Sequence, residues 1–511
     1  MTFMKKSKIW TVICAMFLLL QLAAEVFAAI VIQRMNVLPG KFLVAFYGVL
    51  GFFALLTALL MFLRGKKGVG VGRRIFAIIL AVLVVAGCGV AAFAVNQAYQ
   101  ALNTVTDHPE QSTSVRNLYI FVRVDDPAQT VKDTAGYAYA IVADYDTEHT
   151  QKAIALISQE TGSQLNVSQY EKTSDLADKL YAGEADALLL NGAAIAVLME
   201  DEAYEDFTEK ARILHTFALS DLEEPKPTET QPQETEPVEL DITDRPFVVY
   251  LSGSDTRSNK LLVSRSDVNI LVVVNPVTKQ ILMINTPRDY YVPNPAGNGK
   301  MDKLTHCGLY GTECSMEALS DLYDLQVDYY AQINFTGFET LVDAVGGVTV
   351  YSEQSFKAGS TYIQKGENTL NGEQSLEFAR DRYHVSGGDN GRGKNQMKVI
   401  KAIIEKMTTG TTVISNYSGI LQSLSGMFKT SVAMDDVSKL VKMQLDDMAS
   451  WNIQTYAVTG TGGSEKTYSM PGSYAYVMHK NEASVNHASD LAQRVIAGET
   501  LTEADMKLPQ Q

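Results

Sequence analysis

The chain has 511 residues and a formal net charge of −15 at pH 7. That length allows two or three domains. The negative charge argues against a nucleic-acid partner, because proteins that bind nucleic acid usually carry a basic face. The four cysteines form no CxxC pair and no Cys/His spacing suited to zinc. We therefore expect a multi-domain protein without nucleic acid or structural zinc.

Three hydrophobic segments, residues 9–32, 42–63 and 75–95, open the chain within a predicted transmembrane region 1–97. Each has about the 20 apolar residues that cross a bilayer. The flanking basic residues are Lys5, Lys6 and Lys8 before the first segment, and Arg64, Lys66, Lys67, Arg73 and Arg74 before the third. The positive-inside rule then predicts a multi-pass protein of the cytoplasmic membrane whose large C-terminal region is extracellular. A cleaved signal peptide, with "AAEVFAA" as the small-residue site, is the alternative for the first segment.

Residues 113–220 alternate strand-like and helix-like runs, which predicts an α/β accessory domain. "YAYAIVADYD" is typical of a strand and "TQKAIALISQETG" of a helix that ends at a glycine. No charged cluster there suggests catalysis, so a spacer or interaction module is expected. Residues 221–245 are rich in Pro, Glu and Thr and predict a semi-extended linker. A second, larger domain follows over residues 246–500.

Three strand candidates begin this second domain: "FVVYL", "VNILVVV" and "QILMIN". "NPVTK" separates the last two and predicts a hairpin turn. If the hairpin folds symmetrically, Val274 faces Ile281 and Asp267 comes opposite Arg288. If the first strand is parallel to the third, a mixed sheet gathers six charged residues at one edge: Asp255, Arg257, Arg265, Asp267, Arg288 and Asp289.

Arginine is scarce between residues 246 and 400, where only six occur, three of them at this edge. The planar guanidinium fork binds phosphate oxygens in a bidentate way that lysine cannot match. Of the other three, Arg380 and Arg382 share a face if the backbone between them is extended. Arg392 lies one helical turn before Gln396. Asp389 and Asn390 are candidates to cap that helix, whose N-terminus favours an anion.

The motifs "GSDTR", "RSD", "PRD", "DKLTH", "INFTGFETLVDAVGGVTV" and "LNGEQSLEFARDRY…GDNGRGKNQ" occur in this order over residues 247–407. Together they resemble the LytR-CpsA-Psr family of bacterial cell-wall glycopolymer transferases. The resemblance implies a catalytic domain with an α-β-α sandwich fold, in a protein of the bacterial cell membrane. It also implies transfer of a glycan, such as teichoic acid or capsular polysaccharide, from a polyprenyl-pyrophosphate carrier to a peptidoglycan hydroxyl with Mg²⁺.

Matched by motif, the resemblance implies a role for each residue of the charged edge. Asp255 and Asp267 correspond to the metal-associated acids. The diphosphate site corresponds to Arg257, Arg265, Arg288, Arg380, Arg382, Arg392 and Gln396. The sequence departs from the family at Asn395, where arginine is common, and at Cys307, where alanine is common. Lys394 is placed to supply the missing charge.

The chemistry of phosphoryl transfer suits these residues. Mg²⁺ commonly takes one or two carboxylates together with substrate phosphates. Arg288 and Arg380 are candidates to stabilise the leaving group, and either Asp267 or Asp289 accepts the hydroxyl proton. For any single pair, an ordinary structural ion pair remains the alternative. Two rival functions also remain: a pyrophosphatase that uses water as acceptor, and a non-catalytic receptor for an anionic lipid or polymer.

Two further predictions concern apolar residues and cysteines. Some side chains of "ILVVV" and "ILMIN" line a groove for the polyprenyl tail, with buried core as the alternative for most of them. Cys307 and Cys314 form a disulfide in the extracellular domain. Two helical turns would hold them about 10 Å apart, so Gly308 or Gly311 must break the helix. His306 either contacts the site or is a hydrogen-bonded loop histidine.

Overall fold

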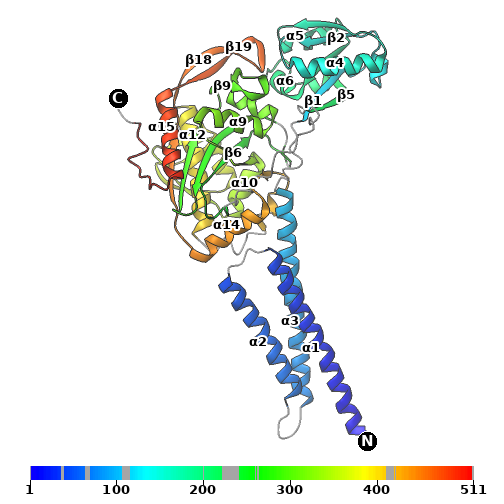
Figure 1. Cartoon of the computed structure of the whole chain (residues 1–511), viewed down its shortest axis with the longest axis vertical. Helices are drawn as coiled ribbons and strands as arrows, with labels where there is room; N and C mark the ends of the chain where they lie inside the picture. The colour runs from blue at the N-terminus through cyan, green and yellow to red at the C-terminus, as the bar shows by residue number, and fades with distance from the viewer. Residues whose placement is uncertain are drawn as a thin grey trace, which may run out of the picture.

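The computed structural model describes residues 2–35, 40–63, 70–105, 115–199, 201–220, 241–258, 260–261, 264–409, 419–420 and 422–508. Figure 1 shows a stalk of three helices that carries two folded domains, with the N-terminus at the far end of the stalk. The predicted linker lies mostly outside the described residues, as do the basic residues Arg64, Lys66 and Lys67.

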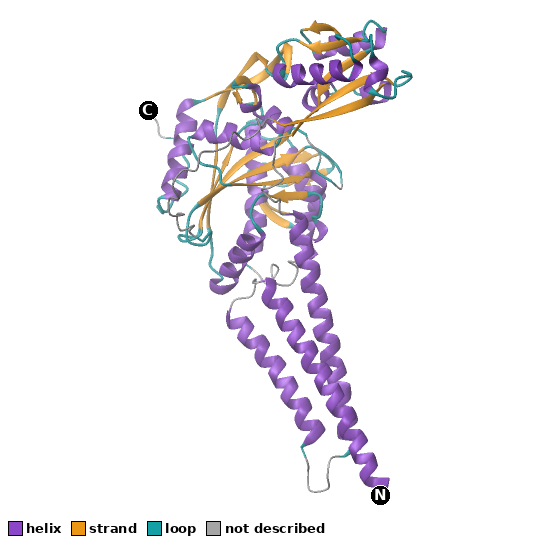
Figure 2. Ribbon diagram, turned by 45° about the vertical axis from the view of Figure 1, so that its right-hand side comes forward, coloured by secondary structure: helices purple, strands orange, loops and turns teal. Residues whose placement is uncertain are grey.

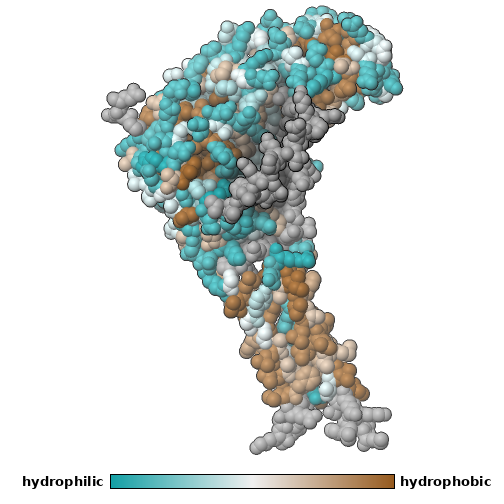
Figure 3. Space-filling view, viewed as in Figure 1, coloured by the Kyte–Doolittle hydropathy of each residue, from teal (hydrophilic) through white to brown (hydrophobic). Residues whose placement is uncertain are grey.

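The stalk consists of α1 (Thr2–Met35), α2 (Gly40–Phe62) and α3 (Val71–Val105). By length and composition, their segments Ile9–Arg34, Gly40–Phe62 and Val71–Phe93 are able to span a membrane. Hydrophobic side chains cover the surface of the stalk (Figure 3), as expected for helices whose apolar atoms face lipid. Helix α3 continues beyond its apolar part and contacts the larger domain at β16 (Phe428–Thr430).

The accessory domain is a five-stranded sheet in the order β3-β2-β4-β1-β5. Its strands are β1 (Val115–Arg123), β2 (Ala138–Val142), β3 (Asn166–Tyr170), β4 (Ala187–Asn191) and β5 (Ala211–Ser220). Its helices are α4 (Thr147–Thr161), α5 (Thr173–Ala182), α6 (Gly192–Leu198) and α7 (Phe207–Lys210). Gly162 ends α4 in the left-handed region, φ 69°, where glycine carries no Cβ penalty.

The larger domain contains a six-stranded sheet in the order β16-β11-β6-β7-β8-β17. The strands not yet located are β6 (Phe247–Ser254), β7 (Ser266–Asn275), β8 (Gln280–Asn285), β11 (Tyr329–Asn334) and β17 (Asn452–Ala457). β11 pairs with β6, and β8 with β17, in parallel, and the other pairs are antiparallel. The predicted mixed sheet is confirmed, and so is the hairpin register, because Val274 pairs with Ile281.

Helices cover both faces of this sheet (Figure 2). Successive residues of β7 point to opposite faces. Leu271 packs in the cluster that includes α9 (Thr312–Tyr323) and α15 (Glu482–Ile496). Ile270 packs with Met397 of α12 (Asp389–Thr408). Helices α10 (Phe335–Ala344), α11 (Gly372–Arg380) and α14 (Met434–Asp447) complete the domain. The expected α-β-α sandwich is confirmed.

Short two-stranded ribbons surround the sandwich. They pair β9 (Tyr291–Asn294) with β10 (Lys300–Lys303), β12 (Val348–Ser352) with β15 (Gly366–Leu370), β13 (Phe356–Ala358) with β14 (Thr361–Ile363), and β18 (Gly460–Thr467) with β19 (Met470–Lys480). The β18–β19 ribbon reaches the accessory domain (Figure 1). At Gly472 a Cβ atom would lie 2.7 Å from the carbonyl oxygen of Glu171, so the two domains are in direct contact there.

Candidate functional site

The open end of the β7–β8 hairpin joins two predicted site residues. Thr286 donates its backbone N–H to the Asn269 carbonyl at 2.9 Å, which continues the strand register past the end of β8. Arg288 Nη1 then lies 2.9 Å from Asp267 Oδ1. A β-bulge places Asp267 opposite no single residue of β6, because Gly253 pairs with Val268 and Ser254 with Ser266. Bulges of this kind re-aim a side chain.

Asp255 and Arg265 form a second pair at the same end of the sheet. Asp255 follows Ser254, which pairs with Ser266, so Arg265 is its neighbour across the strands. Arg265 Nη2 lies 3.0 Å from Asp255 Oδ2, and about a quarter of each side chain is exposed. Both charged motifs of the sequence therefore meet at one edge of the sheet.

The start of α12 approaches this edge closely. A Cβ atom on Gly393 would lie 2.2 Å from Asn285 Nδ2, so α12 comes near the end of β8 and a larger residue at position 393 would displace the Asn285 side chain. The prediction that Asp389 caps the helix is wrong. Gly388, at φ 56°, precedes the helix, and Asp389 is its first residue. Its carboxylate instead pairs with Arg392 at 2.6 Å, one turn further along.

Asp389 is a candidate functional residue that the sequence alone did not single out. Burial raises the pKa of its carboxyl above the ordinary value; Arg392 opposes this rise and Asp289 adds to it. Burial also lowers the pKa of Arg392. The sequence signal that could have indicated a functional role was an acid at the start of a helix, Asp389, with Arg392 three residues later in a glycine-rich motif. A carboxyl of raised pKa in a charged cleft is typical of an acid–base residue.

The "KLTH" segment supports the site from one side. Lys303 Nζ lies 3.2 Å from Asp289 Oδ1, and Arg288 Nε lies 3.8 Å from Asp289 Oδ2. His306 is 2% exposed, and its Nδ1 lies 2.7 Å from Asp302 Oδ1. His306 is thus a hydrogen-bonded loop histidine, and Lys303 is an additional cation at the site.

The other three predicted arginines contact side chains outside these acid–arginine pairs. Arg257 pairs with Glu339 of α10 at 3.2 Å. Helix α11 continues through Arg380, and Asp381, which lies between the two arginines, is extended at φ −66° and ψ 126°. The Arg380 guanidinium stacks over the Phe335 ring at 4.4 Å, and the Arg382 guanidinium lies 4.9 Å from the ring of its neighbour Tyr383.

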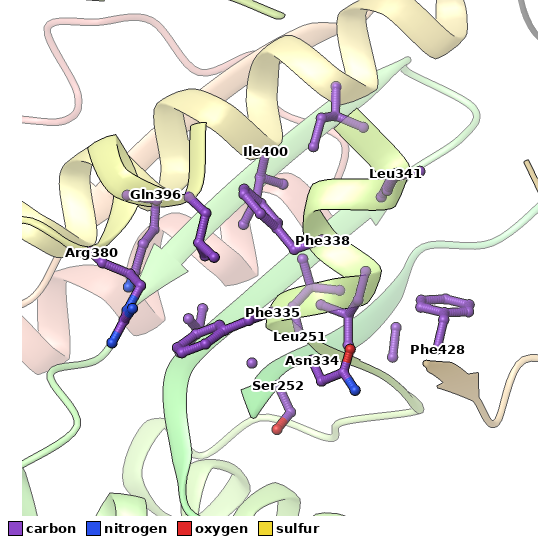
Figure 4. A pocket seen from close by; sticks show the side chains of 17 residues that line it. Leu251, Ser252, Asn334, Phe335, Phe338, Leu341, Arg380, Gln396, Ile400 and Phe428 are labelled. Carbon is purple, nitrogen blue, oxygen red and sulfur yellow. The ribbon is translucent and has the colours of Figure 1, made fainter. Parts of the chain in front are cut away.

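An apolar pocket of about 860 Å³, part of it open to solvent, lies between β6, β11 and helices α10 to α12. Its walls include Leu251, Val268, Phe335, Phe338, Leu341 and Ile400. Figure 4 places Arg380 and Gln396 on one side of it and Phe428 on the other. The groove predicted on "ILVVV" and "ILMIN" is wrong, because the residues of these two runs do not line this pocket. Residues 270–273 and 281–284 are buried sheet core, the alternative stated for most of them. Val268 and the neighbouring strands supply the wall instead.

The predicted disulfide is not formed in the structure. Cys307 and Cys314 are both free buried thiols in the apolar core. Gly311, at φ 108°, breaks the helix between them as expected, and the Cys314 thiol also approaches Asn294 Oδ1 at 3.3 Å. The hydrogen bond with Cys314 and burial raise the pKa of the Cys307 thiol well above its usual value, so the Cys307 thiol stays protonated in this packing.

Asp255 and Asp267 at the sheet edge carry oxygen donors of the kind that Mg²⁺ prefers. Among the described residues, no group of three or more His, Cys, Asp or Glu side chains is arranged to hold a metal. Asp255 and Asp267, however, each engage arginine through one of two carboxylate oxygens. Two carboxylates are enough for Mg²⁺, which takes its other ligands from water and substrate phosphate.

Comparison with known proteins identifies the family to which this architecture belongs. The LytR_cpsA_psr family model matches residues 216–490. The chain belongs to this family. A polyisoprenyl-teichoic acid–peptidoglycan teichoic acid transferase, TagU, of Enterococcus faecalis is 37% identical over 197 residues, which are 38% of this chain and 64% of that protein. The TagU of Oceanobacillus iheyensis is 35% identical over 221 residues, 42% of this chain and 67% of that protein.

Among solved structures, TagT of B. subtilis is 27% identical, with a TM-score of 0.40, and covers 52% of this chain and 97% of that structure. The match to TagU of E. faecalis covers 64% of that protein, so this chain spans just under two thirds of its length. The family match leaves out the stalk and almost all of the accessory domain.

Proposed function

We propose that this LytR_cpsA_psr protein transfers a phosphate-linked glycan polymer from a polyprenyl-pyrophosphate carrier to a peptidoglycan hydroxyl. One observation carries the proposal: the acid–arginine pairs at the end of β7, β8 and α12 stand beside an apolar pocket that Arg380 borders. Such a site suits a donor with a charged diphosphate and an apolar tail. The names of the two TagU relatives point to the same reaction class.

Binding of the diphosphate competes with the ion pairs now present. Arg265, Arg288 and Arg392 exchange a carboxylate partner for phosphate oxygens, which charge-assisted, bidentate hydrogen bonds favour. The acceptor oxygen bonds to the phosphorus next to the glycan, and the bond from that phosphorus to the carrier's phosphate oxygen breaks. Polyprenyl phosphate leaves with the electron pair. The arginines stabilise the charge that develops on it.

Asp255 and Asp267 are the residues that would hold Mg²⁺. Held there, Mg²⁺ would supply neutralisation of negative charge on the diphosphate. Arg265 and Arg288 bind and orient phosphate oxygens beside these acids.

A carboxylate accepts the acceptor's hydroxyl proton. Asp267 and Asp289 were the candidates in the sequence, and each acid of the site is paired with a cation: Asp267 with Arg288, Asp289 with Lys303 and Asp389 with Arg392. We assign the proton to Asp389, because its raised pKa lies closer to a working pH than that of an ordinary carboxylate.

The pocket receives the carrier's isoprenoid chain in this proposal. Phe428 of β16 lines the pocket, and β16 contacts α3, the helix that leads from the stalk. The tail therefore has a short route from the membrane. Arg73 and Arg74 at the start of α3, with the lysines of the N-terminus, support a cytoplasmic N-terminus and an extracellular catalytic domain.

The test is incubation of the full chain in detergent with a short lipid-diphosphate glycan, peptidoglycan fragments and Mg²⁺. Glycan covalently attached to peptidoglycan supports the transferase. Glycan phosphate released equally without an acceptor would show a pyrophosphatase, and tight donor binding without turnover would show a receptor.

A further inference from the structure

The accessory domain packs against the catalytic domain through aromatic residues. Tyr145, at the end of the loop after β2, lies with its ring 5.0 Å from that of Tyr468, at the β18–β19 turn. Leu309 of the catalytic domain packs with Ala193 and Val197 of α6. Lys300 donates to the Asp144 carbonyl at 2.9 Å. This interface contains apolar contacts and directed polar contacts together.

A chain of hydroxyl groups crosses the interface and ends on a buried carboxylate. The Tyr145 hydroxyl lies 2.8 Å from that of Tyr310, which lies 3.0 Å from Ser469 Oγ. Ser469 Oγ donates to Asp302 Oδ2 at 2.5 Å. On the accessory side, the Tyr145 hydroxyl also lies 3.0 Å from Asn191 Oδ1.

The negative charge on Asp302 sets the direction in which the hydroxyl groups donate their hydrogen bonds. Burial opposes ionisation of Asp302, but His306, Ser469 and Asn294 together lower its pKa, so it is a carboxylate at neutral pH. Burial raises the pKa of the Tyr145 and Tyr310 hydroxyls, which stay protonated. Each hydroxyl has one proton to donate. Because the carboxylate is the strongest acceptor, the Ser469 proton points to Asp302 and the Tyr310 proton to Ser469. The single Tyr145 proton is shared between the Tyr310 hydroxyl and Asn191 Oδ1, which can only accept.

Asp302 in turn holds the segment beside the site. Asp302 Oδ1 accepts from the Lys303 N–H at 2.8 Å and contacts His306 Nδ1. Within this segment, Thr305 N–H donates to the Arg288 carbonyl at 2.9 Å and Leu304 N–H to the Tyr290 carbonyl at 2.8 Å. The Lys303 side chain pairs with Asp289. The segment 303–306 therefore holds the backbone that carries Arg288 and Asp289.

We infer that the accessory domain is a positioning element for the diphosphate site, and that Tyr145 is its positioning residue. Tyr145 completes the hydrogen-bonded chain that fixes Asp302, and Asp302 fixes the segment on which Arg288 rests. This inference rests on the proposed function for the catalytic consequence, but the structural coupling can be measured without turnover.

The experiment compares Tyr145→Phe with Tyr139→Phe in the full chain. Tyr139 is the matched control, because it is also buried and donates to Thr134 inside the accessory domain, at 2.6 Å. In Tyr145→Phe we expect amide hydrogen exchange at Leu304 and Thr305 to rise about three- to tenfold, as for the loss of one hydrogen bond. The control leaves these two amides unchanged. Unchanged exchange in Tyr145→Phe overturns the inference.

Kinetics give the second readout. Tyr145→Phe lowers kcat/KM for the donor about three- to tenfold, because Arg288 both binds the diphosphate and stabilises the charge that develops in the transition state. Tyr310→Phe interrupts the same chain, so the double variant loses no more than either single variant. Equal losses in Tyr139→Phe, or additive losses in the double variant, overturn the inference. If wild type shows no transfer while exchange changes as expected, the proposed function fails and the coupling stands.

Discussion

Arg288 reaches back across the open end of the β7–β8 hairpin and donates a hydrogen bond to Asp267 at 2.9 Å. Asp267 raises the pKa of Arg288 above its usual value in spite of burial, which acts in the opposite direction. A guanidinium fixed in this way is a permanent positive charge at the place where the proposed reaction develops negative charge.

Arg288→Ala is therefore expected to lower the transfer rate by about 10²–10³-fold, the usual effect of removing one group that stabilises transition-state charge. Arg288→Lys keeps the positive charge but lacks the planar guanidinium fork, so its transfer rate should lie between those of the wild type and Arg288→Ala. The measurement is initial rate of glycan attachment. Arg494→Ala, which breaks ion pairs with Glu499 and Asp505 elsewhere in the domain, is the control and should keep its rate. Full activity of Arg288→Ala contradicts the mechanism.

Asp389→Asn tests the proton acceptor. The folded chain raises the pKa of Asp389, so kcat should fall as pH decreases through that raised value, where the carboxylate becomes protonated. The variant should lose about 10²–10⁴-fold in kcat together with this acidic limb of the pH–rate profile. Asp289→Asn serves for comparison. If Asp289→Asn loses the acidic limb of the pH–rate profile and Asp389→Asn retains it, then Asp289 is the proton acceptor.

Phe338→Ala tests the apolar pocket. Removing this ring from the wall reduces the apolar area available to the carrier, which we expect to raise KM for a long isoprenoid donor about 5- to 30-fold. A donor with a very short chain should show no change. Tyr362→Ala, an exposed aromatic on β14, is the control. Equal effects of Phe338→Ala on both donors would place the tail elsewhere.

Asp302→Asn tests the buried carboxylate by its effect on stability. The folded pKa of Asp302 is lowered, so the stabilisation from its charge is present above the ordinary value of 3.8 and is lost as pH falls through the folded pKa. Near neutral pH the variant should be about 1–3 kcal/mol less stable, and below pH 3.8 the difference should shrink. Denaturant titrations of both proteins across this range measure it. A difference that grows with acidity would contradict the charge assignment.

The hairpin and its charged end were predictable because one short turn fixes the register of β7 and β8, and the register alone places Asp267 opposite Arg288. The same reasoning extends to Asp255 and Arg265, whose strands are also adjacent. Local rules worked here because every partner lies within about one hairpin of the next.

Residues on long connections were harder to predict. Helix α11 ends at Arg380, whose guanidinium lies over the Phe335 ring of α10, a contact that sequence spacing does not report. Asp389 was interpreted as a helix cap because acids favour that position. In the structure Gly388 is the residue before the helix, and the Asp389 side chain forms an ion pair with Arg392. The ring contact between Tyr145 of the accessory domain and Tyr468 joins segments more than three hundred positions apart, and no local pattern indicates it.

The most direct test of the central claim follows the phosphate. A lipid-diphosphate glycan, labelled with ³²P at the phosphorus next to the glycan, is incubated with the full chain, peptidoglycan fragments and Mg²⁺. We predict that the label becomes covalently bound to peptidoglycan, that unlabelled polyprenyl phosphate is released in equal amount, and that both depend on the acceptor. Label released as free glycan phosphate at the same rate without peptidoglycan, or label retained on the lipid, would contradict the account.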